Sequence, residues 1–177
     1  MKNWTALISL FLFLLLGACS VTSSHTRDAA PLHDTTKSDI QKLAAAPIPR
    51  TNEGWRKRLT PAQFHILREQ GTERPFSSPL DFETRKGTYY GADCGQPLFR
   101  SEQKYDSGTG WPSFFAPISP DALALRTDAT LGIERTEVLS AKCGGHLGHV
   151  FDDGPPPTGK RYCMNGLALL FVPDPGQ

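Results

Sequence analysis

The stretch HLGHVFDDGPPPTGKRYC, residues 146–163, combines two short alternating runs with a turn made of aspartate, glycine and proline. Side chains of a β-strand alternate between its two faces, so every second residue of a run points to the same side. The segment DDGPPPTG is typical of a hairpin connection, which places the two runs next to each other. The side chains that would share one face are His149, Phe151, Asp153, Arg161, Cys163 and Asn165. The stretch therefore predicts an antiparallel hairpin with a polar, thiol-bearing face.

This face would bring a thiol together with the groups that thiol chemistry uses. Arg161 lies two positions from Cys163 and favours the thiolate, which is the reactive form of cysteine. His149 is suited to act as a base or an acid, and Asp153 to orient it or to carry a proton. The set fits thiol redox chemistry or papain-like acyl transfer. A buried structural cysteine flanked by surface charges is an alternative that the alternation alone does not exclude.

Outward from the hairpin, residues 53–177 predict one mainly β domain. A short helix opens it, because Thr60, Pro61 and Gln63 form a capping box with proline at the first helical position, and Gly71 supplies a stop. Short apolar alternations follow, separated by turn residues. The predicted strands are 87–92, 97–100, 132–139, 147–151, 160–163 and 167–172.

Charge and composition narrow the classes of function. The 177 residues carry 19 Lys+Arg and 18 Asp+Glu, a formal net charge of +1, so the chain offers no basic field for nucleic acid. The hydrophobic fraction of 38% supports one globular core but not two. We expect a single folded domain and a monomer.

The N-terminal residues predict an export signal. Lys2 precedes the apolar run Ala6–Ala18, which has the length of a signal-peptide core and is short for the roughly 20 residues of a membrane-spanning helix. The run ends in LGAC, residues 16–19, which resembles the lipobox of bacterial lipoproteins. The resemblance implies a signal peptide over 1–18, cleavage before Cys19 and acylation of that cysteine. Ser20 then favours the outer membrane, facing the periplasm. An uncleaved anchor helix is the alternative.

Residues 19–52 predict a disordered tether between the lipid and the domain. The segment is rich in Ser, Thr, Ala, Pro and charged residues and contains almost no large apolar side chains. Such a composition does not bury enough apolar surface to offset the entropy of ordering.

Four motifs occur in an order that resembles a known family. They are GTERPF (71–76), KYDSGTGWPSFFAPI (104–118), HLGHVFDDGPPPTG (146–159) and RYCMN (161–165). Together they resemble the peptide methionine-R-sulfoxide reductases, the B-type enzymes, over roughly residues 59–173. The resemblance implies two antiparallel sheets in a tent-like arrangement. It also implies reduction of peptidyl L-methionine-R-sulfoxide to methionine, and it leaves open whether the free amino acid is a substrate.

The resemblance implies a role for each residue of the predicted face. Cys163 matches the catalytic cysteine, whose thiolate attacks the sulfoxide sulfur and is left as a sulfenic acid. His149 and Asp153 match the polar group that contacts or protonates the oxygen. Arg161 and Asn165 match residues that support the thiolate and its hydrogen-bond network, and Arg161 is alternatively a solvated strand residue.

Three further residues match the substrate-binding part of the family site. Trp111 and Phe151 match the hydrophobic wall for the S-methyl group, where sulfur–aromatic contacts contribute about 0.3–1.5 kcal/mol. His146 lies near the oxygen-binding group. Trp111 is alternatively a core aromatic residue, and His146 a brace for the CGG turn. Which histidine donates the proton is left open.

The cysteines depart from the family pattern. Many relatives hold a structural zinc with two CxxC pairs, but here Gly91 and Ser140 stand in place of two of the four ligands. We therefore expect no metal. In an oxidising compartment, the remaining Cys94 and Cys143 are expected to form a disulfide or to resolve the sulfenic acid.

A second departure concerns regeneration of Cys163. Many relatives carry a resolving cysteine in the DSG-C-GW loop, and here this position is Thr109. Cys94 or Cys143 then replaces it after a loop movement, or an external, thioredoxin-like dithiol reduces the sulfenic acid directly. No bound cofactor is expected.

The expected partners are oxidised envelope proteins and this reductant. Two other functions remain open at this stage. One is a non-catalytic binding module of the same fold that recognises oxidised proteins, and the other is a hydrolase that uses Cys163 with His149.

Overall fold

A computed structural model describes residues 35–130 and 132–176 of the chain. The expected signal peptide, Cys19 and the first part of the expected tether lie outside the described residues. Within the described ranges, no helix has both the length and the apolar character that crossing a membrane requires.

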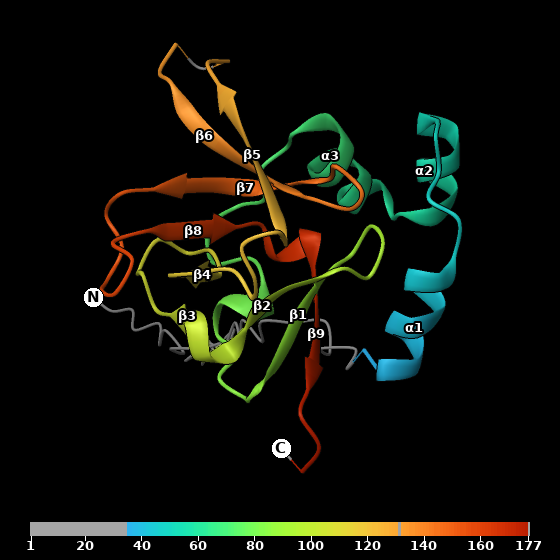
Figure 1. The fold of residues 1–177 in the computed structure, drawn as a ribbon. Coiled ribbons are helices and arrows are strands. Elements are labelled where there is room, and N and C mark those ends of the chain that lie inside the picture. Colours follow the sequence, from blue (N-terminus) through green and yellow to red (C-terminus); the bar gives the residue numbers. More distant parts are fainter. Residues whose placement is uncertain (1–34, 131, 177) are drawn as a thin grey trace, which may run out of the picture.

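The described residues form three α-helices: α1 (Lys37–Ala45), α2 (Asn52–Arg58) and α3 (Pro61–Glu69) (Figure 1). The predicted capping box of α3 is confirmed, since the Thr60 hydroxyl accepts from the backbone of Gln63 and the Gln63 side chain accepts from that of Thr60. Phe64 and Leu67 bury one face of α3 against the core. The helix ends at Glu69, and Gln70 caps it in a left-handed conformation, one residue before the predicted stop at Gly71.

Helix α1 corrects the prediction of a disordered tether up to residue 52. A capping box between Thr36 and Asp39 begins the helix, and Ile40 is buried with 6% of its surface exposed. In α2, which begins at the last tether residue, Trp55 is 3% exposed. One buried apolar side chain is enough to dock each of these short helices on the fold. The average composition of the segment does not reveal such single side chains.

Nine strands form two antiparallel sheets in the described part of the chain. The smaller sheet contains β1 (Gly87–Gly91), β2 (Pro97–Arg100) and β9 (Leu169–Pro173) in the order β2-β1-β9. The larger sheet has the order β3-β4-β8-β7-β6-β5. Its strands are β3 (Lys104–Tyr105), β4 (Ser113–Phe114), β5 (Leu123–Asp128), β6 (Arg135–Ser140), β7 (His146–Phe151) and β8 (Arg161–Met164).

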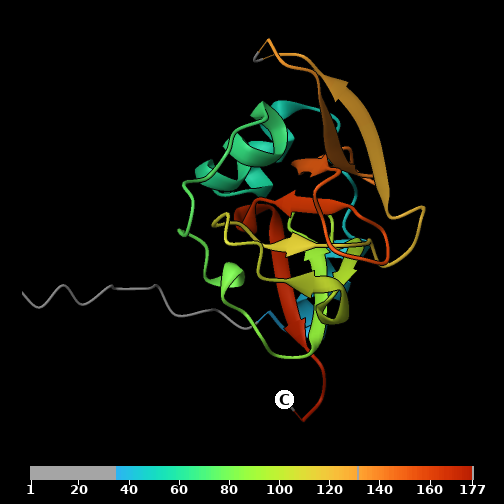
Figure 2. The same ribbon diagram turned by 90° about the vertical axis from the view of Figure 1, so that its left-hand side faces the viewer.

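The predicted mainly β class with two antiparallel sheets and an early helix is confirmed. All six predicted strands are present, and β3, β4 and β5 are additional. Strands β3 and β4 have two residues each, too few for an alternation to be recognised. Strand β5 forms the outer edge of the larger sheet, and its hairpin with β6 extends away from the rest of the fold (Figures 1 and 2).

Aromatic side chains join the two sheets. Phe114 of β4 stacks on Phe99 of β2 with ring centroids 4.2 Å apart, and its edge meets Tyr89 of β1 at 5.0 Å. All three rings are completely buried. Because side chains alternate along a strand, Ser113 points away from this core while Phe114 points into it. The same relation holds in β8 between Cys163 and the buried Met164.

Candidate active site

The predicted hairpin is confirmed, and its register brings the predicted residues face to face. In the pairing of β7 with β8, His149 lies opposite Cys163 and Phe151 lies opposite Arg161. Directly opposed residues of an antiparallel pair carry their side chains on the same face of the sheet. The register extends Cys163 and His149 into a row across all six strands, which we call the cysteine row: Tyr105, Ser113, Cys163, His149, Glu137 and Arg126.

Two glycines allow the hairpin strands to approach closely. A Cβ atom on Gly148 would lie 2.1 Å from the carbonyl oxygen of Cys163, and one on Gly154 would lie 1.9 Å from that of Lys160. In the turn, the Gly154 amide donates to the Gly159 carbonyl at 3.0 Å. Larger residues at these positions would push β7 and β8 apart, so the glycines help to fix the register.

A pocket of about 150 Å³ opens over the cysteine row. It is lined by Thr72, Trp111, Arg135, Gly148, His149, Phe151, Cys163 and Asn165. Five of the eight residues predicted for catalysis or substrate binding therefore meet at one cavity. Of the remaining three, His146 lies next to His149, Arg161 lies over the Phe151 ring, and Asp153 pairs with Arg161.

The sulfur of Cys163 is half-buried and lies 3.9 Å from the hydroxyl oxygen of Thr109. Burial raises the pKa of the Cys163 thiol, and the Thr109 hydroxyl, the Arg161 charge and the Ser113 hydroxyl oppose this rise without cancelling it. Arg161 acts in the predicted direction, but desolvation outweighs it. At neutral pH the resting site thus holds a thiol rather than the predicted thiolate.

Arg161 contacts both Phe151 and Asp153. Its Nε and Nη2 atoms donate to the two carboxylate oxygens of Asp153, both at 2.9 Å, and its guanidinium lies 4.4 Å from the centre of the Phe151 ring. The hydrogen bond with Asp153 raises the pKa of Arg161. Asp153, predicted beside His149, is instead exposed and paired with the arginine, two residues after the end of β7.

His149 is held by a residue that the sequence analysis missed. Its Nε2 atom lies 2.8 Å from Oδ2 of Asp128, at the end of β5. Arg135 of β6 donates to the same oxygen at 2.6 Å. Strands β5 and β6 form the hairpin at the edge of the larger sheet, so no local sequence pattern around His149 predicts the contact.

His146 is 2% exposed and pairs with a different carboxylate. Its Nδ1 atom lies 2.7 Å from Oε1 of Glu137, and its ring centre lies 5.4 Å from that of His149. Burial lowers the pKa of His146 although Glu137 opposes this change, so His146 is neutral and Nδ1–H is the donor. Glu137 also accepts from Gln70 at 3.0 Å and from Arg126 at 2.8 Å. The contact with β6 replaces the suggested role of His146 as a brace for the CGG turn.

Glu73 of the GTERPF motif anchors the opposite wall of the pocket. Its backbone amide donates to Oδ1 of Asn165 at 3.0 Å, and its carbonyl accepts from the Trp111 indole at 3.1 Å. Its buried carboxylate accepts the amides of Gly166 and Leu167 at 2.6 and 2.9 Å. Trp111 is half-buried at the pocket and is not a core residue. Glu73 was missed because its contacts join distant segments, 38 positions apart for Trp111 and 92 to 94 positions apart for residues 165–167.

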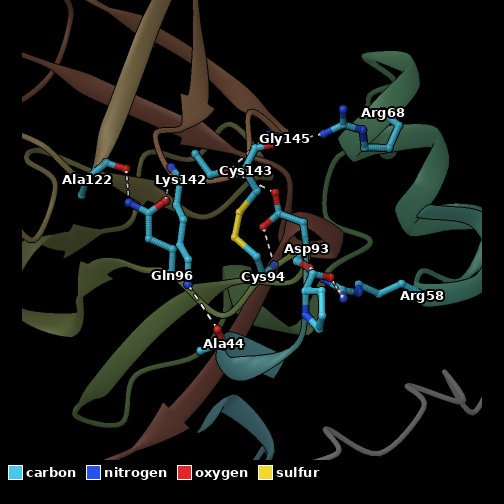
Figure 3. The surroundings of a disulfide bond; sticks show 12 residues. Ala44, Arg58, Arg68, Asp93, Cys94, Gln96, Ala122, Lys142, Cys143 and Gly145 are labelled. Carbon is cyan, nitrogen blue, oxygen red and sulfur yellow. Dashed lines mark hydrogen bonds between the residues drawn. A yellow bond between two sulfur atoms is a disulfide. The ribbon is translucent and has the colours of Figure 1, made fainter. Parts of the chain in front are cut away.

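Cys94 and Cys143 form the expected disulfide, with Cα atoms 6.5 Å apart (Figure 3). It joins the turn after β1 to the turn between β6 and β7. Beside it, the completely buried Asp93 accepts a hydrogen bond from the Ser140 hydroxyl at 3.0 Å. Burial raises the pKa of Asp93, and the bonds from Ser140 and Cys94 oppose this rise.

The residues at this place do not match a structural zinc site of four thiolates. Among the described residues, the one cluster with metal-ligand spacing is Asp93, Cys94 and Cys143, and both of its sulfurs belong to the disulfide. The Asp93 carboxylate fills the space beside Gly91, where an added Cβ atom would lie 2.7 Å from its Oδ1. The disulfide and a hydrogen bond from Ser140 to Asp93 thus connect these two loops.

Comparisons with known proteins agree with this geometry. Residues 59–173 match the family described as the SelR domain. A protein of Agrobacterium fabrum named peptide methionine sulfoxide reductase MsrB is 53% identical over 134 residues, which cover 76% of this chain and 99% of the relative. Proteins with the same name from Methanosarcina barkeri and Thiobacillus denitrificans are 52% and 54% identical over 129 and 125 residues. These matches cover 73% and 71% of this chain, and 91% and 95% of the respective relatives.

Loss of the disulfide is expected to destabilise the domain. The bond joins residues 49 positions apart, and closing a loop of this size contributes about 2–4 kcal/mol. Chemical denaturation of a variant with Cys94→Ser and Cys143→Ser should show this loss, whereas Cys163→Ser, which leaves the bond intact, should not. Equal unfolding midpoints for the double variant and the wild type would contradict the expectation.

The environment of Cys163 predicts the pH dependence of its alkylation. Because the pKa of Cys163 is raised, its rate of alkylation by iodoacetamide should continue to increase with pH beyond the pKa of an ordinary cysteine. Arg161→Ala should raise the pKa further and slow alkylation at neutral pH by about tenfold, which corresponds to one pKa unit. Lys160→Ala is the control, since that ammonium pairs with Asp152. A titration midpoint below that of a free cysteine would refute this description of the thiol.

Proposed function

The chain belongs to the SelR-domain family of peptide methionine sulfoxide reductases, and we propose that Cys163 is the residue through which it acts. It is a thiol-dependent oxidoreductase that reduces methionine-R-sulfoxide to methionine. The observation that carries the assignment of Cys163 is its position opposite His149, at a pocket that Trp111 also lines. Because the relatives are reductases, a reductase is favoured over the alternative function of a non-catalytic binding module.

The reductase step transfers one oxygen atom and two electrons. The sulfur of Cys163 attacks the sulfoxide sulfur, the S–O bond of the substrate breaks, and the oxygen ends on the cysteine. The thiol and the sulfoxide thereby become a sulfenic acid and a thioether, with the thiol proton retained on the sulfenic oxygen. The methionine sulfur is reduced by two electrons and Cys163 is oxidised by two.

The pocket supplies a group for each part of the substrate. Trp111 and Phe151 are suited to contact the S-methyl group, because aromatic rings favour sulfur and methyl contacts. His149, directly opposite Cys163, is suited to carry the proton between the thiol and the sulfoxide oxygen. Asn165 helps to hold the strand, and Arg161 supplies positive charge near the sulfur. Asp153 holds Arg161 in place. His146 is neutral and supports this group from behind.

Turnover of the separated epimers tests the assignment of Cys163. With dithiothreitol as reductant, the wild type should reduce N-acetyl-methionine-R-sulfoxide and leave the S epimer unchanged. Cys163→Ser should lose activity completely, since serine does not accept the oxygen. The control Cys94→Ser with Cys143→Ser should retain turnover at a temperature where it is folded. Activity that survives Cys163→Ser would remove this assignment.

We further propose that an external dithiol reduces the sulfenic acid directly. Within the described residues, Cys163 is the one cysteine with a free thiol, and the Thr109 hydroxyl lies 3.9 Å from its sulfur. Two thiols of the reductant then form a disulfide, water is released, and the Cys163 thiol is regenerated. A thioredoxin-like protein has the required chemistry.

A cysteine introduced at the neighbouring position tests this route. After one turnover without reductant, the wild type should hold a sulfenic acid that dimedone traps and that mass spectrometry locates at Cys163. Thr109→Cys should instead form a disulfide with Cys163, since position 109 contacts the sulfur. If the wild type links Cys163 to Cys94 or Cys143, the internal route operates and the proposal fails.

We propose that the enzyme is a lipoprotein of the bacterial outer membrane that repairs oxidised envelope proteins. The proposal rests on the apolar run Ala6–Ala18, whose last three residues form the motif LGAC (16–19) with Cys19. In a bacterial host, the chain should incorporate labelled palmitate and fractionate with membranes, and Cys19→Ala should abolish both. A mature N-terminus at a residue other than Cys19 would refute lipidation.

A further inference from the structure

We infer that Asp128 is the positioning residue of His149: it binds Nε2 of the imidazole, so that Nδ1 is the nitrogen that serves the substrate. Arg135 holds Asp128 in place. The inference rests on the proposed role of His149 in proton transfer and names the residues on which that role depends.

The carboxylate of Asp128 is fully engaged by four donors. Oδ2 accepts from Nε2 of His149 at 2.8 Å and from Arg135 at 2.6 Å. Oδ1 accepts from the hydroxyl and the amide of Thr130 at 2.7 and 3.0 Å. The side chains of Asp128 and His149 are only 10% and 11% exposed, so water competes weakly for these bonds. The carboxylate therefore has little freedom to release the imidazole.

The register of β5 and β6 explains how Asp128 reaches a histidine two strands away. Asp128 lies opposite Arg135, two positions from the cysteine row along both strands, so both side chains share the face of that row. Arg135 also lines the substrate pocket. The β5–β6 hairpin thus carries the ion pair of Arg135 and Asp128 in a partly buried position. Its carboxylate binds His149, a proposed catalytic group.

The carboxylate also fixes the tautomer of the imidazole. The pKa of Asp128 lies well below its usual range. The main cause is the hydrogen bond from the Thr130 hydroxyl, followed by those from the Thr130 amide and from His149. An ionised carboxylate only accepts, so the hydrogen lies on Nε2 of His149. Nδ1 then accepts a proton from a thiol when the ring is neutral and donates one when the ring is charged. Within the described residues, no side chain forms a hydrogen bond with this nitrogen.

The two histidines therefore have different roles although both bind carboxylates. His146 bonds Glu137 through Nδ1 and is 2% exposed, in the interior, whereas His149 bonds Asp128 through Nε2 and lines the pocket. Opposite nitrogens are thus fixed on neighbouring rings. This difference favours His149 as the proton carrier and places His146 behind it.

A double-mutant cycle tests whether Asp128 acts through His149. Single-turnover reduction of N-acetyl-methionine-R-sulfoxide is measured for the wild type, Asp128→Ala, His149→Ala and the combination. Asp128→Ala should slow the wild type by about 100-fold, the lower range of a positioned proton donor, but should slow His149→Ala by less than about threefold. Glu134→Gln is the matched control, since it removes an exposed carboxylate from the same hairpin and should change nothing.

Two further readouts exclude a purely structural role. Alkylation of Cys163 by iodoacetamide without substrate should proceed at the wild-type rate in Asp128→Ala. Imidazole nitrogen chemical shifts should show the Nε2–H tautomer of His149 in the wild type and a mixture in Asp128→Ala, a result that does not depend on activity. Equal slowing by Asp128→Ala with and without His149, or a wild-type Nδ1–H tautomer, would overturn the inference.

Discussion

The site depends on one constraint, the pairing register of β7 with β8. A shift of one residue in an antiparallel pair turns every side chain of the strand to the other face of the sheet. Here such a shift would place Cys163 in the aromatic core and the apolar Met164 at the pocket. The close contacts of Gly148 with β8 and of Gly154 with Lys160 in the turn oppose this change, and so does the continuation of the row through β4 and β6.

Core and site use opposite faces of the same strands. Phe114 and Met164 pack between the sheets while their neighbours Ser113 and Cys163 face the pocket loops. Packing that holds the core therefore also holds the reactive sulfur, and the half-burial that results raises the pKa of the thiol. The site compensates with groups around the sulfur, namely Arg161 and two hydroxyls, and with a fixed histidine that is suited to take up the proton.

The sequence predicted what local patterns determine. The hairpin followed from alternation and a turn signal, α3 from its capping box, and the disulfide from the family resemblance. Contacts between strands were not predictable: Asp128 reaches His149 only after β5, β6 and β7 have paired, and Glu137 reaches His146 only after β6 and β7 have paired. The state of the thiol was also missed, because alternation places an arginine near Cys163 but does not reveal how much water the fold excludes.

The central claim is that the register of the hairpin places the substrate sulfoxide between Cys163 and His149. A crystal structure of Cys163→Ser with N-acetyl-methionine-R-sulfoxide bound tests this most directly. The account predicts that the sulfoxide sulfur contacts the side chain at position 163, its methyl group contacts Trp111, and its oxygen points to Nδ1 of His149. A ligand whose oxygen points away from His149, or which binds outside this pocket, would contradict the account.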